Sequence, residues 1–170
     1  KASRESSFRR IQRFMAQMVL DLDAVARYLK SRIPFDGPYT LTMDRTNWKF
    51  GEVNINVLVL GIAYDHMSFP ILFRLLPKRG NSNCKERINI MERFIRLFGR
   101  DSIKCLVADR EFVGNEWFKW LNDSAIQYHI RIRDNFWVEE PRTGRKVRAQ
   151  HIFANLKLGE ERILDRIYRV

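Results

Sequence analysis

Residues 106–114 read L-V-A-D-R-E-F-V-G, and this stretch decides how the rest of the chain is interpreted. An apolar run from Cys105 to Ala108 leads without alternation into Asp109, and Gly114 then opens a helix-like segment. Such a run is typical of a central parallel strand that is covered on both faces. Reactive side chains of open α/β sheets gather at the carboxyl ends of such strands. The pattern therefore makes Asp109 a candidate site residue, although a single aspartate there also suits a helix cap or a turn.

A second carboxylate, Asp44, is the candidate partner of Asp109. It lies in the segment 39–50, Y-T-L-T-M-D-R-T-N-W-K-F, whose alternation is typical of a strand with residues 40, 42 and 44 on one face. Neighbouring strands lie about 4.8 Å apart. If these two strands are neighbours, the aspartates can share a metal ion, which would neutralise the repulsion between them.

Composition narrows the class of partner. The chain has 170 residues and 45% apolar content, enough for one domain with a core plus appendages. Its 31 Lys and Arg against 20 Asp and Glu give a net charge of +11, which favours nucleic acid ahead of an anionic membrane as partner. The longest apolar run, Val57 to Tyr64, is too short to span a membrane as a helix. Without C-x-x-C or H-E-x-x-H, a zinc site is disfavoured.

The order of expected elements indicates the fold class. Segment 6–33 is helical in pattern, and Asp21 suits the cap of a second helix. After it we expect a strand around Asp44, strands at 55–64 and 68–76, a helix from Asn83 to Gly99, the Asp109 strand, a helix at 115–124 and a strand at 126–132. This is the order of the ribonuclease H-like fold, an α/β mixed sheet of three antiparallel strands and then parallel strands, with flanking helices. A right-handed crossover then brings the Asp109 strand parallel to the Asp44 strand.

Two blocks of sequence resemble a known family. D-R-T-N-W-K-F-G from Asp44 and A-D-R-E-F-V-G around Asp109, with Trp117 and R-I-R at 131–133 downstream, are similar to the first two catalytic blocks of bacterial insertion-sequence DDE transposases. The subgroup is the one whose third block reads Y-x-x-R-x-x-x-E followed by Lys. The resemblance spans residues 41–135.

The resemblance implies an enzyme that cuts and joins DNA strands with two Mg²⁺ or Mn²⁺ ions. It makes Asp44 and Asp109 the catalytic and metal-binding residues. The implied partner is double-stranded DNA, bound by a homodimer rather than at a membrane, in the bacterial cytoplasm and associated with the nucleoid.

The third acid of that family, a glutamate on a later helix, is not identifiable. Glu111 follows Asp109 too closely, the glutamates at 139 and 140 fall in an expected hairpin whose turn is 141–144, and those at 160 and 161 precede a strand-like run at 162–170. We expect an N-terminal helical segment at 1–36, a partial catalytic core at 37–135 and the start of a β-rich insertion at 136–170. The chain is then a fragment that lacks the final glutamate and is inactive alone.

Basic and aromatic residues around the acids are candidate DNA contacts. Arg45, Lys49 and Arg110 could reach phosphates, and Trp48 could stack on a base, although packing in the core is the preferred interpretation for Trp48. The tryptophans at 117 and 120 recur at helical spacing and are expected in the core. A downstream basic cluster predicts a DNA-facing surface or an ordinary solvated hairpin, and its candidate contacts are Arg131, Arg133, Arg145 and Lys146.

Two other functions stay open on the sequence. One is a different ribonuclease H-like metal nuclease, such as a resolvase. The other is a non-catalytic DNA-binding relic, in which Asp44 and Asp109 would bind no metal.

Overall fold

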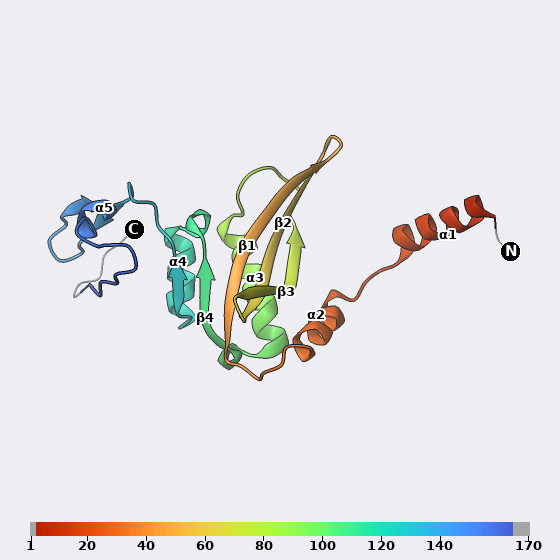
Figure 1. Cartoon of the computed structure of the whole chain (residues 1–170), viewed down its shortest axis with the longest axis horizontal. Coiled ribbons are helices and arrows are strands. Elements are labelled where there is room, and N and C mark those ends of the chain that lie inside the picture. The colour runs from red at the N-terminus through yellow and green to blue at the C-terminus, as the bar shows by residue number, and fades with distance from the viewer. Residues whose placement is uncertain (1–2, 165–170) are drawn as a thin grey trace. The chain divides into compact units, whose positions relative to one another are not determined.

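The computed structural model describes residues 3–164 and divides the chain into two compact units, Lys1–Pro34 and Phe35–Val170 (Figure 1). The helices of the first unit are α1 (Arg4–Gln17) and α2 (Leu22–Ser31). The Asp21 carboxylate accepts two backbone N–H groups from the first turn of α2, which confirms the predicted cap. The N-terminal segment is therefore two helices.

Five strands of the second unit form one mixed sheet in the spatial order β3-β2-β1-β4-β5 (Figure 1). The strands are β1 (Tyr39–Phe50), β2 (Val53–Tyr64), β3 (Met67–Leu75), β4 (Ile103–Ala108) and β5 (Tyr128–Ile130). β2 pairs antiparallel with both β1 and β3, whereas β4 runs parallel to both β1 and β5. This is the strand order of the ribonuclease H-like fold, so the predicted fold class is confirmed.

Parallel strands need long connections, and two helices supply them. α3 (Cys84–Phe98) leads from β3 to β4, and α4 (Asn115–Asp123) leads from β4 to β5. Two 3₁₀ turns, η1 (Arg100–Ser102) and η2 (Arg110–Phe112), flank β4. α3 begins at the predicted capping box between Asn83 and Glu86, and Gly99 ends it with a φ of +83°, where a residue without Cβ is unstrained.

The core lies on one face of the sheet. Leu41 and Met43 of β1 are buried and pair in register with Leu106 and Ala108 of β4, which are also buried. The helices contribute further large buried side chains, namely Met91, Phe94, Trp117 and Leu121. The core position predicted for Trp117 is confirmed, whereas Trp120 is half-buried and stacks on Trp117 with ring centroids 5.5 Å apart.

The C-terminal part of the second unit contains a small hairpin. β6 (Trp137–Glu139) and β7 (Lys146–Arg148) pair antiparallel around the predicted turn, and α5 (Ala149–Ile152) follows. β5 is shorter than predicted, so the R-I-R run at 131–133 lies beyond it. Of the strand-like run predicted at 162–170, residues 162–164 form no strand and the rest lies outside the described residues. Within residues 3–164, the helices are too short or too polar to cross a membrane.

Candidate functional site

Asp44 lies on the central strand β1, and Asp109 directly follows the neighbouring strand β4. The parallel register pairs Met43 of β1 with Ala108 of β4, so the aspartates are the next residues along each chain. Because Met43 and Ala108 point into the core, the residues that follow them lie on the opposite face, and both aspartates are exposed to solvent. The strands that lead to the two aspartates are therefore neighbours, as predicted, and joint metal binding by the two carboxylates stays a prediction.

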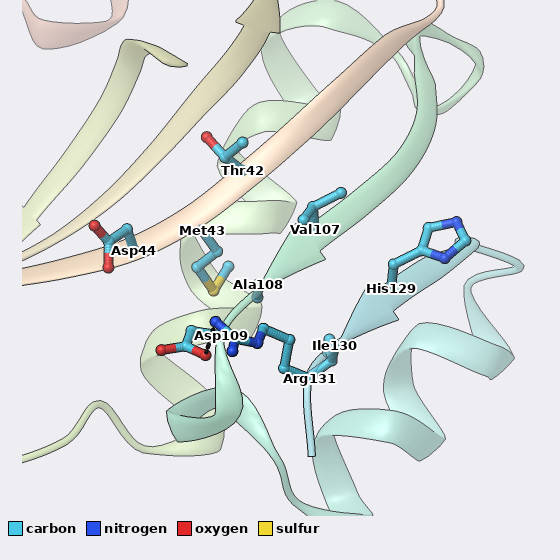
Figure 2. Close-up of a pocket in the computed structure, with 9 residues that line it drawn as sticks. All are labelled: Thr42, Met43, Asp44, Val107, Ala108, Asp109, His129, Ile130 and Arg131. Atoms are coloured by element: carbon cyan, nitrogen blue, oxygen red, sulfur yellow. Dashed lines mark ion pairs between the residues drawn. The ribbon is translucent and has the colours of Figure 1, made fainter. Parts of the chain in front are cut away.

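Both aspartates line one open groove of about 690 Å³ (Figure 2). β4 and β5 end at this groove, whereas β1 continues past it into the hairpin with β2. The lining comes from these three strands and the residues that follow them: Thr42, Met43, Asp44, Val107, Ala108, Asp109, His129, Ile130 and Arg131. The carboxyl ends of parallel strands are where α/β sheets place ligands.

Arg131 lines the groove and forms an ion pair with Asp109. Among the interactions described for residues 3–164, it is the basic residue of the lining that pairs with an acid. Its Nη1 lies 3.7 Å from Oδ1 of Asp109 (Figure 2). The side chains are 81% and 52% exposed, so this pair is solvated and weak. The backbone N–H of Arg131 donates to the carbonyl of Ala108, which fixes where the side chain starts. Arg131 can therefore release Asp109 at little cost when another cation arrives.

The donor set of the groove fits a hard divalent cation. Carboxylate oxygens are the ligands that Mg²⁺ prefers, and Mg²⁺ is commonly held by one or two carboxylates plus waters and substrate phosphates. In residues 3–164, no group of three or more His, Cys, Asp or Glu side chains is arranged to hold a metal ion. Asp44 and Asp109 can therefore supply two protein ligands, and the remaining positions are left to water and substrate.

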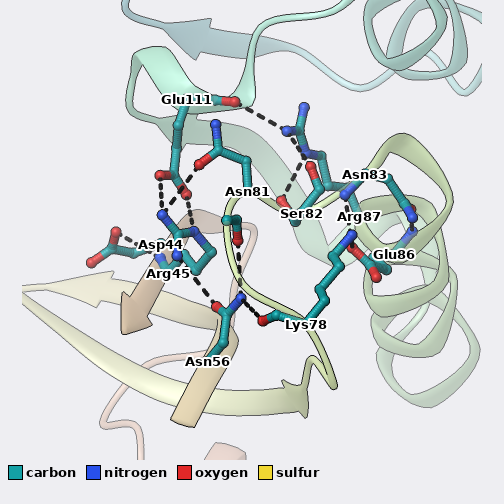
Figure 3. Close-up of polar contacts among 11 residues, drawn as sticks. Asp44, Arg45, Asn56, Lys78, Asn81, Ser82, Asn83, Glu86, Arg87 and Glu111 are labelled. Carbon is teal, nitrogen blue, oxygen red and sulfur yellow. Dashed lines mark hydrogen bonds and ion pairs between the residues drawn. The ribbon is translucent and has the colours of Figure 1, made fainter. Parts of the chain in front are cut away.

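The residue after Asp44 points the other way and closes a polar network beneath the site (Figure 3). The Arg45 guanidinium donates from Nε and Nη2 to the two carboxylate oxygens of Glu111, at 3.0 and 3.1 Å. It also donates to the side-chain oxygens of Asn56 and Asn81, each at 3.3 Å. Its side chain is only 13% exposed, so a phosphate contact from Arg45 stays a prediction that would require breaking these bonds.

Arg87 of α3 holds the other side of this network. It is buried, with Nη2 donating to the carbonyls of Ser82 (2.7 Å) and Glu111 (3.0 Å), and Nε donating to the Ser82 hydroxyl (3.0 Å). Its guanidinium also lies over the ring of Phe112, 5.1 Å from the centroid. Burial lowers the pKa of Arg87, and these acceptors compensate the buried charge.

The remaining predicted contacts near the acids are at the surface. Trp48 is 48% exposed, so the preferred core interpretation for it is wrong. The physical reason is that β1 extends past the end of β4 here, and within residues 3–164 the side chains at 46–50 are all exposed. Lys49 and Arg110 are also exposed, the latter at the start of η2.

The downstream basic residues are spread over a loop and the small hairpin. Arg133 and Arg145 are exposed. Lys146 pairs across the β6–β7 hairpin with Glu139 at 3.4 Å, a solvated contact. These positions leave both interpretations of the cluster open, a DNA-facing surface and an ordinary solvated hairpin.

Sequence reasoning missed several residues around the site. Glu111 was considered only as a metal ligand, yet it is the partner of Arg45. Asn56 carried a readable signal, because it is a polar residue that alternates onto the same face as Leu58, Leu60 and Ile62, and it is 1% exposed. His129 gave no signal, since its place in the groove depends on where β5 pairs with β4.

Comparisons with known proteins add the family. The family described as transposase DDE domain matches residues 27–169. No curated protein matches the chain. Among solved structures, the chain is similar to the HTLV-2 integrase catalytic core domain in complex with magnesium, at 14% identity and a TM-score of 0.43, over 55% of this chain and 61% of that one.

The chain is also similar to a simian T-cell lymphotropic virus intasome in complex with a PP2A regulatory subunit, at 14% identity and a TM-score of 0.46, over 61% of this chain and 38% of that one. The chain spans less than two thirds of the length of either structure. The fold assignment therefore rests on the strand order of the sheet, and the family on the match over residues 27–169. By that match, this chain belongs to the transposase DDE domain family.

Proposed function

We propose that Asp44 and Asp109 bind divalent metal ions, Mg²⁺ or Mn²⁺, for the cutting and joining of double-stranded DNA at insertion-sequence ends. The observation that carries this proposal is the placement of both carboxylates on one open groove, at adjacent positions of two parallel strands. Membership of the transposase DDE domain family supports the same chemistry.

Each aspartate has a distinct role in this proposal. Asp44, on the central strand, would be a ligand of both ions, and Asp109 would hold one of them. Bound ions of this kind activate a water or a DNA 3′-hydroxyl and stabilise the leaving oxygen. The open form of the groove leaves room for a phosphodiester between the protein ligands.

Exposed basic residues would position the DNA backbone. Arg131 is mobile enough in its solvated pair with Asp109 to move from the carboxylate to a phosphate oxygen. Lys49, Arg110, Arg133, Arg145 and Lys146 add positive charge, and Trp48 offers a ring for base stacking. Two DNA ends would be paired by a homodimer in the bacterial cytoplasm, close to the nucleoid.

Within residues 3–164, Asp44 and Asp109 are the carboxylates that line the groove. Two carboxylates suffice for one ion together with waters, but a second ion gains few protein ligands. We therefore expect this chain alone to bind the second ion weakly and to show little strand-transfer activity.

Calorimetric titration of the chain with Mn²⁺ tests the proposal. Asp44→Asn and Asp109→Asn each remove one charged ligand with little change of shape, and both should abolish the heat of binding. Asp101→Asn is the matched control, because Asp101 is an exposed aspartate of η1 that does not line the groove. Heats that are the same in all four proteins would contradict metal binding and favour the DNA-binding relic.

A further inference from the structure

We infer that the ion pair between Arg45 and Glu111 is a clamp that sets the spacing of Asp44 and Asp109, which makes these two side chains positioning residues. This role rests on the proposed function. Arg45 directly follows Asp44, and Glu111 lies two residues after Asp109, so the pair joins the two backbone segments that carry the acids.

The geometry of the pair suits a clamp. Two parallel N–H···O bonds of 3.0 and 3.1 Å hold a planar guanidinium against a carboxylate, which fixes orientation as well as distance. The side chains are 13% and 24% exposed, so water screens this pair less than it screens Arg131 and Asp109. Of these two ion pairs, Arg45–Glu111 is thus the better oriented and the less exposed to solvent.

The clamp is anchored to the fold on the Glu111 side. The turn η2 begins directly after Asp109, and among the described residues no side chain caps its N-terminus. Instead the backbone carbonyl of Glu111 accepts from buried Arg87 of α3. Glu111 is therefore tied to α3 through its backbone and to β1 through its carboxylate.

The clamp is anchored on the Arg45 side by Asn56. This buried amide accepts from Arg45 and donates to the carbonyls of Lys78 and Gly80, both at 2.9 Å (Figure 3). The two ends of the pair are thus fixed to different elements, α3 on the Glu111 side and, on the Arg45 side, β2 with the loop after β3. By contrast, the parallel pairing of β1 with β4 ends at Met43 and Ala108, one residue before the acids. Beyond that point the Arg45–Glu111 pair connects the two segments.

The test measures Mn²⁺ affinity in variants that keep both aspartates. Arg45→Met removes the fork, and Glu111→Gln keeps the shape of the acceptor but removes its charge. Partners that orient metal ligands are commonly worth 10-fold to 100-fold in metal affinity. We expect the Kd for Mn²⁺ to rise about tenfold in each single variant, and the double variant to be no weaker than the worse single one, because both changes break the same pair.

Glu86→Gln is the matched control. It breaks another partly buried ion pair, the 2.8 Å contact between Lys78 and Glu86, whose side chains are 34% and 14% exposed. This contact lies at the cap of α3 and joins neither segment that carries an acid. The control should lower the unfolding temperature about as much as Glu111→Gln does, while leaving the Kd for Mn²⁺ unchanged.

Hydrogen exchange in the metal-free chain separates this inference from the proposed function. We expect the backbone amides of η2 to exchange faster in Arg45→Met and Glu111→Gln, but not in Glu86→Gln. Suppose that the wild-type protein binds Mn²⁺ and that this binding depends on Asp44. Unchanged Mn²⁺ affinity in both clamp variants would then overturn the clamp but not the proposed function. Wild-type protein without such binding would overturn the proposed function, and unchanged exchange in η2 would still count against the clamp.

Discussion

Asp44 and Arg45 are consecutive residues of β1, yet their side chains lie in opposite environments. Asp44 faces the open groove and, like Asp109, is exposed to solvent. Arg45 faces inward, where four bonds from its guanidinium reach Glu111, Asn56 and Asn81. Two consecutive residues of one strand therefore differ in their surroundings: the side chain of Asp44 is open to solvent, and that of Arg45 is held by hydrogen bonds.

The difference assigns metal binding to the residues of the groove face and the holding of the backbone to the residues of the inward face. Groove carboxylates must keep oxygen lone pairs free for metal ions, so their side chains cannot be fixed by strong contacts of their own. Residues beneath them can be fully hydrogen-bonded, and they hold the backbone from which the acids project. Substitutions on the inward face should therefore change stability, and they should change metal binding only through the position of the acids. Substitutions on the groove face should change binding directly.

The largest effect is expected for Arg87→Met. This change leaves buried acceptors of Ser82 and Glu111 without a donor, so the free energy of unfolding should fall by about 3 kcal/mol. Urea denaturation measures the loss. A loss below about 1 kcal/mol would mean that the inward network is not a support, and the contrast between the two faces would disappear.

Trp48→Ala should give the clearest effect on DNA binding. Trp48 alternates onto the same face of β1 as Asp44 and is 48% exposed, so its removal should change the free energy of unfolding by less than about 0.5 kcal/mol. Loss of one stacked base should weaken single-stranded DNA binding by about 1 kcal/mol or more. Fluorescence anisotropy measures the affinity. A destabilised protein with unchanged affinity would place Trp48 in the core after all.

Lys49→Ala is the companion change on the same hairpin. Removing one phosphate contact should reduce the slope of log K against log salt by close to 0.9 for duplex DNA. Trp48→Ala should leave that slope unchanged, because stacking releases no counterions. Equal slopes in wild type and Lys49→Ala would remove Lys49 from the DNA interface.

The contribution of the Glu86 carboxylate, at the cap of α3, to the free energy of unfolding should change with pH by up to about 1 kcal/mol. Burial raises the pKa of Glu86, but hydrogen bonds from Lys78 and the Asn83 backbone outweigh it, so the pKa lies below its usual value of 4.5. A carboxyl with a lowered pKa stabilises the fold above pH 4.5 and loses this contribution as the pH falls through the folded-state pKa. The stability difference between wild type and Glu86→Gln should therefore shrink on acidification, as thermal unfolding at several pH values can show. A stability difference that stays the same at every pH would contradict the lowered pKa of Glu86.

The smallest effect on stability is expected for Asp44→Asn. Its carboxylate contacts the adjacent Arg45 N–H at 2.7 Å, and the amide oxygen of asparagine can replace that acceptor. The free energy of unfolding in metal-free buffer should change by less than about 0.5 kcal/mol. A large loss would mean that Asp44 is a structural residue.

The sequence predicted the strands that position Asp44 and Asp109, but not the hydrogen-bonded residues that hold those strands in place. Apolar runs and turn residues placed Asp44 and Asp109 on strands, and the right-handed crossover made those strands neighbours. The Arg45–Glu111 pair could not be read, because its partners come from segments whose meeting depends on the register of β1 with β4. Trp48 was misjudged because the alternation of β1 does not reveal where β4 stops covering it.

The most direct measurement is the anomalous scattering of crystals of this chain soaked in Mn²⁺. We predict an anomalous peak in the groove of Figure 2, within coordination distance of both Asp44 and Asp109, with Arg131 displaced from Asp109. Well-ordered crystals without a peak there, with Arg131 still paired to Asp109, would contradict the claim that these two carboxylates form a metal site.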